Sequence, residues 1–418
     1  MAEIEPFRAL HYDPGVTGGL QDVVAPPYDV IDDEQRLALE ARSPYNVVRI
    51  DLSQGGEDRY RLAADQLRAW RAAGVVVEDE QPALWALVQD YTGPDGRPRT
   101  RRGYFARVRI EQYGAGRIRP HERTHPGPKE DRLRLTRATQ TNLSPIFSLY
   151  SDPAGATQGV LEQAVTEPAW AQTSDHDGTV NRLWRVADPD AVATVQGALR
   201  DAELLIADGH HRYETARVYA DEIGGEGLHR YVLMCLVALQ DPGLTVFPTH
   251  RLVRGLAPAQ QEALAAALVR DFQIEALPDT AALAPTAGGT IRIGYIDSHF
   301  RKPFMLTLAD PTIADAALPA HAEPYRRLDT AVLEALILKG ALEMSDADID
   351  ELRGLGYARD FEQALQLIET AAYDAAFFMA PTPIELVQAV ASAGESMPPK
   401  STYFFPKVPT GLLFNPLA

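Results

Sequence analysis

Cysteine and long apolar runs are scarce in this sequence of 418 residues. The one cysteine, Cys235, lies in the apolar run 231–239, so no disulfide can form within the chain. No apolar stretch reaches the ~18 residues of a membrane span. The acidic start at residues 1–7 is unlike a signal peptide. We therefore expect a cytoplasmic protein in which Cys235 serves as a small buried hydrophobic side chain.

Clusters of positive charge are also missing, and the formal net charge is −18. The most basic stretch, Arg-Pro-Arg-Thr-Arg-Arg at 97–102, follows a turn and is predicted to be a solvated hairpin arm. Proteins that bind nucleic acid or anionic membranes usually present a basic surface. We therefore expect neither as a partner, and predict a small-molecule substrate instead.

Common nucleotide and hydrolase motifs are absent. The chain has no Walker A loop, no Rossmann glycine pattern and no Gly-x-Ser-x-Gly elbow. This excludes a recognisable P-loop kinase, dinucleotide enzyme or serine hydrolase.

Lysine is the rarest basic residue. Only five of the 40 Lys and Arg residues are Lys, at positions 129, 302, 339, 400 and 407. A lysine kept in so Arg-rich a chain suggests a position that needs a compact ammonium group. Three of the five, Lys129, Lys400 and Lys407, lie in the most polar segments.

Helix and strand patterns alternate along the chain, which predicts a mixed α/β (α+β) fold. Two apolar runs around a Gly-Pro-Asp-Gly turn predict a β-hairpin. The expected elements include helices at 32–41, 59–73 and 210–222, a strand at 46–52, the hairpin at 83–91 and 103–110, and a helix opened by Thr382 as N-cap and Pro383.

The most site-like segment is Asp208-Gly209-His210-His211-Arg212. A strand is expected to end here, Gly209 to turn the chain, and a helix to begin. The first turn of a helix presents unpaired N–H groups and the positive end of the dipole, which together favour an anion. Cationic side chains at that end are costly unless an anion binds, so the segment indicates a phosphate site. Asp208 is a candidate base or Mg²⁺ ligand.

A second polar segment covers residues 120–132. His121-Glu122-Arg123-Thr124-His125 has the spacing of a zinc protease motif, but that motif needs a helix. Pro126 disfavours helix at His125 and Pro128 follows closely, so we reject a zinc site. We expect a loop inside the long polar stretch 114–150, which also has a short helical part. It would offer charged groups to a ligand from His121, Glu122, Lys129, Asp131 and Arg132.

The third segment, Lys400-Ser401-Thr402-Tyr403-Phe404-Phe405-Pro406-Lys407, holds two of the five lysines. A lysine beside a hydroxyl suits a phosphate oxygen, but a docked C-terminal strand with solvated lysines fits equally well. Two smaller candidates, assigned to substrate binding, are Tyr28-Asp29 and His250-Arg251.

These segments carry a resemblance to a known family. The whole chain is identified as a member of a prokaryotic family called domain of unknown function, number one thousand and fifteen. The resemblance rests on six segments: 25–29, 121–122 with 129–132, 144–147, 208–212, 248–251 and the tail 397–411.

Asp208–Arg212 also resembles the signature of the ParB/sulfiredoxin-like fold, in which a Gly-x-x-Arg turn holds nucleotide phosphates. One branch of that fold is similar to free-serine kinases. The resemblance implies that Gly209, His210, His211 and Arg212 cradle phosphate, and that Glu122 or Asp208 is base or metal ligand. The chain departs from ParB in its acidity and lack of DNA-binding helices. It departs from sulfiredoxin because His211 stands where the cysteine is expected.

The resulting hypothesis is a Mg²⁺-dependent phosphotransferase with a nucleotide or pyrophosphate as donor and a small hydroxylated metabolite, L-serine first, as acceptor. A phosphatase or nucleotide hydrolase and a nucleotide-sensing protein stay open as alternatives. The assigned residues are: catalytic, Asp208, Glu122 and His121; phosphate-binding, Gly209, His210, His211, Arg212, Lys129, Arg132, Lys400, Ser401 and Lys407; metal, Asp208 and Asp131; substrate, Tyr28, Asp29, His250 and Arg251.

The expected organisation has a ParB/sulfiredoxin-like core with α/β elements added at both ends. Residues 1–150 form an N-terminal α/β region, 151–255 the phosphate-binding core, 256–327 a small α/β lobe, and 328–418 a helical region with a polar tail that packs back on the core.

Overall fold

The computed structural model describes residues 3–93, 96–114, 116–122 and 126–418, without the side chains of 126–128. Contacts group the chain into two compact units. Unit 1 comprises residues 1–120, 124–245 and 406–418, and unit 2 comprises 121–123 and 246–405. The division into four regions stays a prediction.

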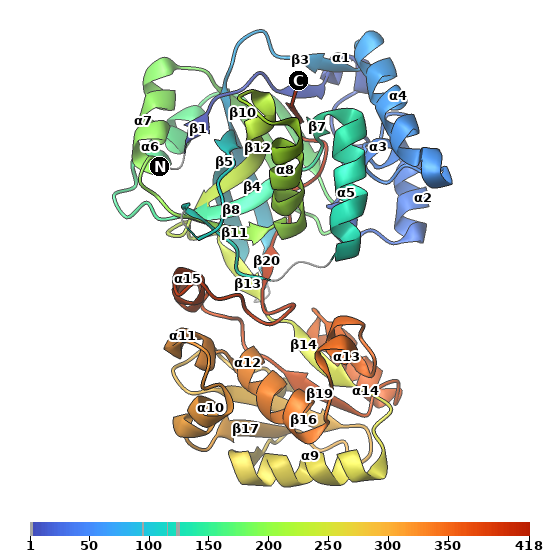
Figure 1. Cartoon of the computed structure of the whole chain (residues 1–418), viewed down its shortest axis with the longest axis vertical. Coiled ribbons are helices and arrows are strands. Elements are labelled where there is room, and N and C mark those ends of the chain that lie inside the picture. Colours follow the sequence, from blue (N-terminus) through green and yellow to red (C-terminus); the bar gives the residue numbers. More distant parts are fainter. Residues whose placement is uncertain (1–2, 94–95, 115, 123–125) are drawn as a thin grey trace. The chain divides into compact units, whose positions relative to one another are not determined.

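Unit 1 combines a large sheet with helices and short ribbons (Figure 1). Its strands are β1 (Ile4–Glu5), β2 (Leu10–Tyr12), β3 (Val76–Glu78), β4 (Leu84–Thr92), β5 (Pro98–Arg109), β6 (Ile118–Arg119), β7 (Thr141–Asn142), β8 (Ile146–Tyr150), β9 (Ala171–Ser174), β10 (Val180–Val186), β11 (Leu204–Asp208), β12 (Tyr231–Ala238) and β21 (Asn415–Pro416). Its helices are α1 (Pro14–Thr17), η1 (Tyr28–Val30), α2 (Asp33–Arg42), α3 (Val48–Asp51), η2 (Gly56–Asp58), α4 (Arg59–Ala72), α5 (Pro126–Thr139), α6 (Ala156–Ala164), α7 (Pro189–Leu199), α8 (His210–Ile223) and η3 (Leu228–Arg230).

The main sheet of unit 1 has the strand order β6-β11-β8-β12-β5-β4-β10-β9, with β1 paired to β5. Alternate residues of its strands build one core with Leu161 of α6, Val195 of α7 and Tyr213 of α8. These three helices therefore cover one face of the sheet. The residues in between, such as Gln89, Arg101, Phe147 and Cys235, point to the opposite face. That second face carries the polar site described below.

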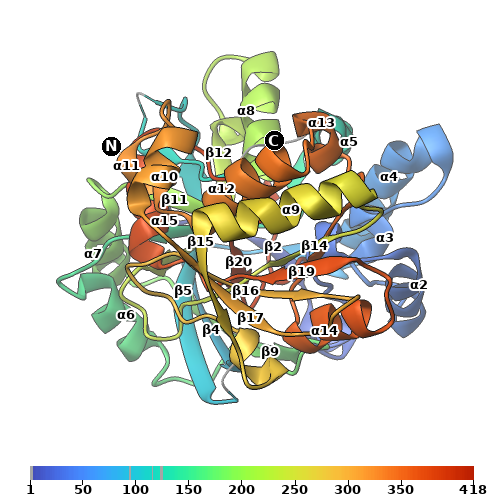
Figure 2. The ribbon, with the colours of Figure 1, turned by 90° about the horizontal axis from the view of Figure 1, so that it is seen from below.

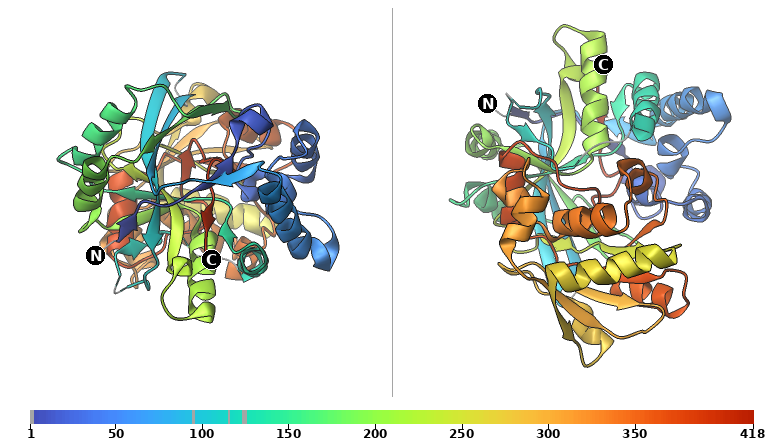
Figure 3. Two further views of the ribbon diagram at one scale, coloured as in Figure 1. Left: turned by 90° about the horizontal axis from the view of Figure 1, so that it is seen from above. Right: turned by 60° about the horizontal axis from the view of Figure 1, so that its bottom comes forward.

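Helix α8 packs against α5, and α5 packs against α4 (Figure 1). The N-terminal helices, blue in Figure 3, lie on the α5 side of the sheet. Helix α4 follows from an amphipathic pattern that buries Tyr60, Leu67 and Trp70. The expected helices at 32–41, 59–73 and 210–222 are confirmed as α2, α4 and α8.

Unit 2 contains a smaller sheet and its own helices. The strands are β13 (Thr245–Phe247, which starts at the unit boundary), β14 (His250–Val253), β15 (Phe272–Ala276), β16 (Arg292–Asp297), β17 (Phe304–Leu308), β18 (Leu355–Ala358), β19 (Ala375–Phe378) and β20 (Tyr403–Phe405). The helices are α9 (Pro258–Asp271), η4 (Thr280–Leu283), α10 (Pro311–Ala317), α11 (Glu323–Arg326), α12 (Asp329–Leu333), η5 (Glu334–Ala341), α13 (Asp346–Asp350), α14 (Phe361–Glu369) and α15 (Ile384–Ser392).

The sheet of unit 2 has the order β15-β17-β16-β19-β14-β18 and is covered on both faces. Phe377 of β19 points into a core with α9, α12 and η5, whereas Phe378 points into a core with α14. Figure 2 shows α9 and α12 on one side of these strands and α14 on the other. The fold class predicted from the sequence, mixed α/β, is confirmed.

Several local predictions are wrong. The expected strand at 46–52 is helix α3, and residues 126–139 of the expected polar loop are helix α5. The basic stretch 97–102 is mostly strand β5, and Arg101 in it is buried, not solvated. Thr382 caps no helix, because its hydroxyl donates to Ser401 O at 2.9 Å.

Some predictions fall on residues outside those described. The hairpin β4–β5 is confirmed, but Pro94 and Asp95 of its turn lie outside the described residues. The same holds for Arg123, Thr124 and His125 of the rejected zinc motif and for the first two residues of the acidic N-terminus. Within the part of the chain that is described, no helix combines the length and apolar character needed to cross a membrane.

Candidate functional site

The turn between β11 and α8 is the centre of the site in unit 1. Gly209 has φ of +97°, a left-handed conformation that favours glycine. A Cβ on Gly209 would lie 3.0 Å from Nε of Arg212, so the guanidinium of Arg212 covers the backbone of the turn. The pairing of β11 with β8 shifts register between Ile206 and Asp208, which brings Asp208 opposite Phe147. The sequence predicted this strand–glycine–helix geometry correctly.

Asp208 binds two cations from distant parts of the chain. Its Oδ2 accepts a hydrogen bond from Nη2 of Arg212 at 2.6 Å, and its Oδ1 accepts one from Nζ of Lys407. Burial alone raises the pKa of Asp208, but the charges of Lys407 and Arg212 outweigh this effect and hold the pKa well below its usual range. Asp208 is therefore ionised at neutral pH and is a weak base in this arrangement.

Arg212 is further fixed by the segment that precedes β8. Its Nη1 donates to Oγ of Ser144 at 2.7 Å and to the carbonyl of Pro145. Ser144 Oγ also accepts a hydrogen bond from Oγ1 of Thr410 at 2.9 Å. Thr410 exchanges two backbone hydrogen bonds with Ala25. Four segments that are remote in sequence, around residues 25, 144, 208 and 410, thus meet in unit 1.

Arg101 of β5 is a member of this cluster that sequence reasoning missed. It is 1% exposed, and its guanidinium lies 4.4 Å from the ring centre of Phe147. Its Nη2 donates to the carbonyl of Pro406 at 2.5 Å, while Gln89 Nε2 donates to the carbonyl of Lys407 at 3.1 Å. The two side chains therefore hold the backbone that carries Lys407.

Burial also affects the pKa of Arg101. Burial lowers this pKa to about 10, so the guanidinium is still protonated at neutral pH. Its Nη1 is buried and has no hydrogen-bond partner among the described residues. The signal that could have revealed this burial is the alternation along β5, which places Arg101 on the same face as Gly103 and Phe105.

Arg132 lies in a separate network of charges in the same unit. Its guanidinium is 2.8 Å from Oδ1 of Asp51 and 2.6 Å from Oδ2 of Asp131, and lies over the ring of Tyr28 at 4.3 Å. Arg59 and Tyr60 donate to the other oxygen of Asp131. Burial raises the pKa of Asp131, but Arg132, Tyr60 and Arg59 together lower it below its usual value. The predicted phosphate ligand Arg132 is thus paired with two carboxylates.

Tyr28 and Asp51 are affected by the same burial. Burial raises the pKa of Tyr28 to about 12, although Arg212 and Arg132 act against the shift. It also raises the pKa of Asp51, again against both arginines. Tyr28 is therefore a neutral hydroxyl at physiological pH. Asp29, the neighbouring candidate, is exposed.

Two small cavities adjoin these side chains. One of about 40 Å³ is lined by Tyr28, Asp51, Arg132, Ser144 and Arg212 among others. The other, of about 90 Å³, lies beside Asp131 and Arg59. Such volumes hold waters or a small ion, whereas sites for larger ligands measure about 300–1,000 Å³.

The remaining candidates of unit 1 lie on α5 and at the start of α8. His210 is buried and His211 is half-buried at the first turn of α8. Lys129 lies on helix α5, not on a loop, with Nζ 4.0 Å from Oε2 of Glu214. Its carbonyl accepts a hydrogen bond from Thr215 at 3.4 Å, which joins it to α8.

Unit 2 gathers a second set of predicted residues around the segment 397–405. His121 is fully buried, with Nε2 2.8 Å from Oγ1 of Thr402 and 3.9 Å from the carboxylate of Glu122. Ser401 is buried too, and its hydroxyl donates to Pro398 O at 2.7 Å and lies 3.1 Å from that of Thr330. Lys400 is exposed with φ of +57°.

His250 and Arg251 also belong to unit 2 and are buried. Nη1 of Arg251 donates to Thr249 O at 2.5 Å and Nη2 to Pro399 O at 3.1 Å. Burial lowers the pKa of His250 to about 4 and raises that of Asp329, a neighbour of Arg251, to about 6. Asp329 is another residue that the sequence did not single out.

Asp208 and Asp131 are the predicted metal ligands. Each oxygen of both carboxylates already accepts a hydrogen bond from a cation or a hydroxyl. Among the described residues, no three His, Cys, Asp or Glu side chains cluster as metal ligands would. Mg²⁺ commonly binds through substrate phosphates with only one or two carboxylates. Among the described residues, Asp208 and Asp131 therefore do not fit a metal that is held by protein ligands alone.

Fold and site together define an α/β protein with a buried cluster of Arg101, Arg212 and Lys407 around one carboxylate. The chain belongs to the family described as "Protein of unknown function (DUF1015)", whose model matches residues 4–331. No curated protein matches the chain.

Several solved structures are similar to this chain at low identity. A free serine kinase variant in complex with AMP is 12% identical, with a TM-score of 0.38 over 74% of this chain and 92% of that one. A conserved hypothetical protein from Pyrococcus furiosus is 16% identical, with a TM-score of 0.37 over 74% and 95%. SbnI with a C-terminal truncation from Staphylococcus aureus is 11% identical, with a TM-score of 0.38 over 73% and 85%.

Proposed function

We propose that this protein is a phosphotransferase that moves a phosphoryl group from a nucleotide or pyrophosphate, as its Mg²⁺ complex, to the hydroxyl of a small metabolite. L-serine is the first acceptor to test. The observation that carries the proposal is the Asp208 cluster, in which Arg212 and Lys407 share one carboxylate beside the start of α8. Arg101 adds a third positive charge. The cluster carries a net positive charge, which favours a phosphate.

Phosphoryl transfer depends mainly on positioning and on stabilising charge in the transition state. In the proposal, Arg212, Lys407 and the first N–H groups of α8 bind the phosphate of the donor. Asp208 orients Arg212 and Lys407 and is not the base, because its pKa is held low. Mg²⁺ bound to the donor supplies further charge neutralisation. Glu122 and His121 belong to unit 2 and stay predicted catalytic residues.

The test is phosphorus NMR of the purified full-length protein with Mg²⁺ and L-serine, using ATP, ADP and pyrophosphate in separate tubes. A phosphoserine resonance supports the proposal and identifies the donor. Release of inorganic phosphate without phosphoserine would replace it with the hydrolase. An unchanged spectrum together with ligand-induced stabilisation would replace it with the nucleotide sensor.

Variants then locate the activity. Arg212→Ala should lower turnover at least 100-fold, as expected for loss of a charged group that acts on the transition state. Arg217→Ala is the matched control, since Arg217 lies on the same helix and is also fixed by a hydrogen bond, to Gln112. It should retain turnover within about twofold of the parent. Equal loss in Arg217→Ala would show that the effect is on folding.

A further inference from the structure

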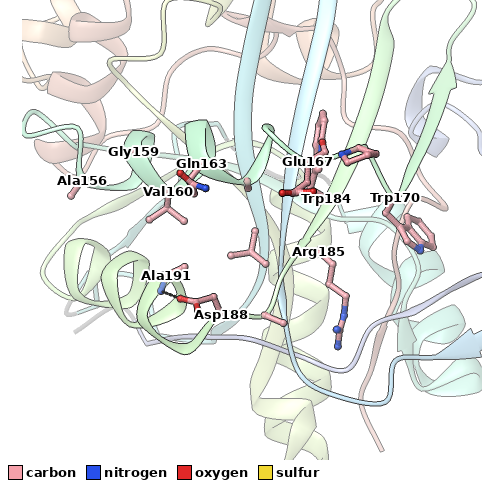
Figure 4. A pocket seen from close by; sticks show the side chains of 14 residues that line it. Ala156, Gly159, Val160, Gln163, Glu167, Trp170, Trp184, Arg185, Asp188 and Ala191 are labelled. Atoms are coloured by element: carbon pink, nitrogen blue, oxygen red, sulfur yellow. Dashed lines mark hydrogen bonds between the residues drawn. The ribbon is translucent and has the colours of Figure 1, made fainter.

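A larger pocket lies elsewhere in unit 1, between α6, α7 and β10 (Figure 4). Its volume is about 630 Å³, and no residue of the Asp208 cluster lines it. Pockets of about 300–1,000 Å³ with mostly apolar walls and a few polar groups are typical of small-molecule sites. The pocket is thus large enough for a ligand of its own.

Two of the four tryptophans line this pocket. Trp184 of β10 is 7% exposed, and Trp170 precedes β9. Trp170 makes edge contacts with Trp85 at 4.9 Å and His11 at 4.8 Å between ring centres, so a rigid aromatic group supports it. Val160 adds an aliphatic wall.

The volume exists because small residues face it. Ala156 and Gly159 of α6 lie opposite Ala191 of α7 in the lining (Figure 4), and Ala164 of α6 lines the pocket too. A Cβ built on Gly159 meets no atom within 4 Å. A larger side chain at this position would therefore enter the pocket without displacing the protein.

Hydrogen bonds hold the walls in place. Nε1 of Trp184 donates to the carbonyl of Glu167 at 2.7 Å, which fixes the segment after α6. Asp188 accepts from the backbone N–H of Ala191 at 2.9 Å and so caps α7. The pocket is consequently formed before any ligand binds.

The polar groups of the lining are mainly acidic. Glu167 and Asp188 are exposed and contribute two carboxylates. Arg185, the one basic residue of the lining, donates to Gln81 O at 2.6 Å and lies 3.5 Å from the carboxylate of Asp79. Figure 4 shows its guanidinium extending away from Trp184. An anionic ligand would therefore face repulsion.

We propose that this pocket binds a small organic cation, with an apolar or aromatic body against Trp184 and Val160 and a protonated amine beside Glu167. Indole rings attract cations through their negative faces, and aromatic groups combined with a carboxylate are a known way to bind an ammonium group. The proposal does not depend on the phosphotransferase reaction, because the two sites share no residue.

The experiment titrates the full-length protein with three probes of equal size and different charge: 2-phenylethylamine, 2-phenylethanol and phenylacetate. Binding is followed by calorimetry and by tryptophan fluorescence, to which Trp184 and Trp170 contribute two of the four indole rings. We expect saturable binding of the amine, binding of the alcohol at least fivefold weaker, and none of phenylacetate at the same concentrations.

Two variants locate the binding. Gly159→Leu fills the pocket and should weaken binding of the amine at least tenfold. Glu167→Gln should bring the affinity for the amine down to that for the alcohol. Gly197→Leu is the matched control, because Gly197 is also a helical glycine with open space around its Cβ position but does not line the pocket.

Four results would overturn the proposal: no saturable binding of the amine, equal binding of the amine and the alcohol, unchanged binding in Gly159→Leu, or equal loss in Gly159→Leu and Gly197→Leu. Phosphotransferase activity that is unchanged in Gly159→Leu would leave both proposals standing, since they concern separate sites.

Discussion

Arg212 and Lys407 contact the carboxylate of Asp208, Arg101 interacts with it electrostatically, and the charges of these four side chains do not cancel. Arg212 and Lys407 contact Asp208 directly, whereas Arg101 contacts Gln89 and a backbone carbonyl. Removing a charge from water is costly unless it is compensated. A bound phosphate would supply the missing negative charge, which is the physical reason to place the donor here.

The turn at Gly209 should tolerate no side chain. Gly209→Ala places a Cβ in a left-handed conformation and 3.0 Å from Nε of Arg212. We expect a loss of about 2–3 kcal/mol in the free energy of unfolding, from backbone strain and the displaced guanidinium. Urea denaturation measures this loss.

The matched control is Gly178→Ala. Gly178 has φ of +79° but open space around its Cβ position. Gly178→Ala should lose only about 1 kcal/mol of the free energy of unfolding, which is the cost of the left-handed backbone conformation. Equal losses in the two variants would mean that contact with Arg212 adds nothing.

Asp329 should make the stability of the protein depend on pH. Burial raises its pKa in the folded state to about 6, above that of an unfolded chain. The fold therefore favours the protonated form, and the stability gained is full below about pH 4 and is lost as the pH rises through about 6. The free energy of unfolding of the parent should therefore fall by about 2–3 kcal/mol over this pH range because of Asp329. In Asp329→Asn the side chain stays neutral, so this part of the fall should be absent.

Chemical denaturation from pH 4 to 8 measures the Asp329 effect, with Asp279→Asn as control at an exposed carboxyl. A parent and an Asp329→Asn variant with parallel stability curves would contradict the account.

At the scale of elements, α3 shows where sequence patterns fail. Residues 46–52 alternate like a strand, but the side chain of Asn46 accepts from Val48 N at 3.0 Å and donates to Asp22 O at 2.8 Å and Val24 O at 3.2 Å. These contacts start a short helix instead. The two carbonyls that accept from Asn46 lie more than twenty positions before it, which no local pattern contains.

Asn46 should accordingly be essential for this corner of unit 1. Asn46→Ala leaves a part-buried carbonyl, a buried carbonyl and a buried N–H without their partner, and should cost about 2–4 kcal/mol of unfolding free energy. Thermal and urea denaturation measure the cost. Gln54→Ala, at an exposed side chain with one hydrogen bond, should cost less than about 0.5 kcal/mol. An equally small effect of Asn46→Ala would show that α3 forms without this network.

Helices and strands with a clear periodicity or turn sequence could be predicted from the sequence. Features that depend on tertiary packing could not. The amphipathic helix α4, the hairpin β4–β5 and the β11–Gly209–α8 turn follow from periodicity and turn residues. Helix α5 was predicted only as a short helical part of the stretch 114–150. Pro126 and Pro128 suggested a loop at its start, although proline is tolerated in the first turn of a helix. The burial of Arg101 was missed because a charged residue in a basic run is usually solvated.

For the whole molecule, the sequence predicts which polar segments are candidates for the site but not how these segments group. Unit 1 gathers the segments at 25–28, 144–145, 208–212 and 407–410. Unit 2 gathers 121–122, 250–251 and 397–402. Composition shows that a segment is suited to a ligand. Which segments lie together, when more than 150 residues separate them in the sequence, is decided by the tertiary fold. The tail 400–407 illustrates this, since it is divided between the units at residue 406.

The most direct test of the central claim is calorimetric titration of Mg²⁺–pyrophosphate into the parent protein, Lys407→Gln and Lys302→Gln. Lys407 contacts Asp208, whereas Lys302 is exposed on unit 2 and serves as the matched control. Loss of a charged hydrogen bond to phosphate costs about 1.5–3 kcal/mol, so Lys407→Gln should bind about 10–100-fold more weakly than the parent. Lys302→Gln should match the parent, and melting curves establish that all three are folded. Binding by Lys407→Gln as tight as that of the parent would contradict a phosphate site at Asp208.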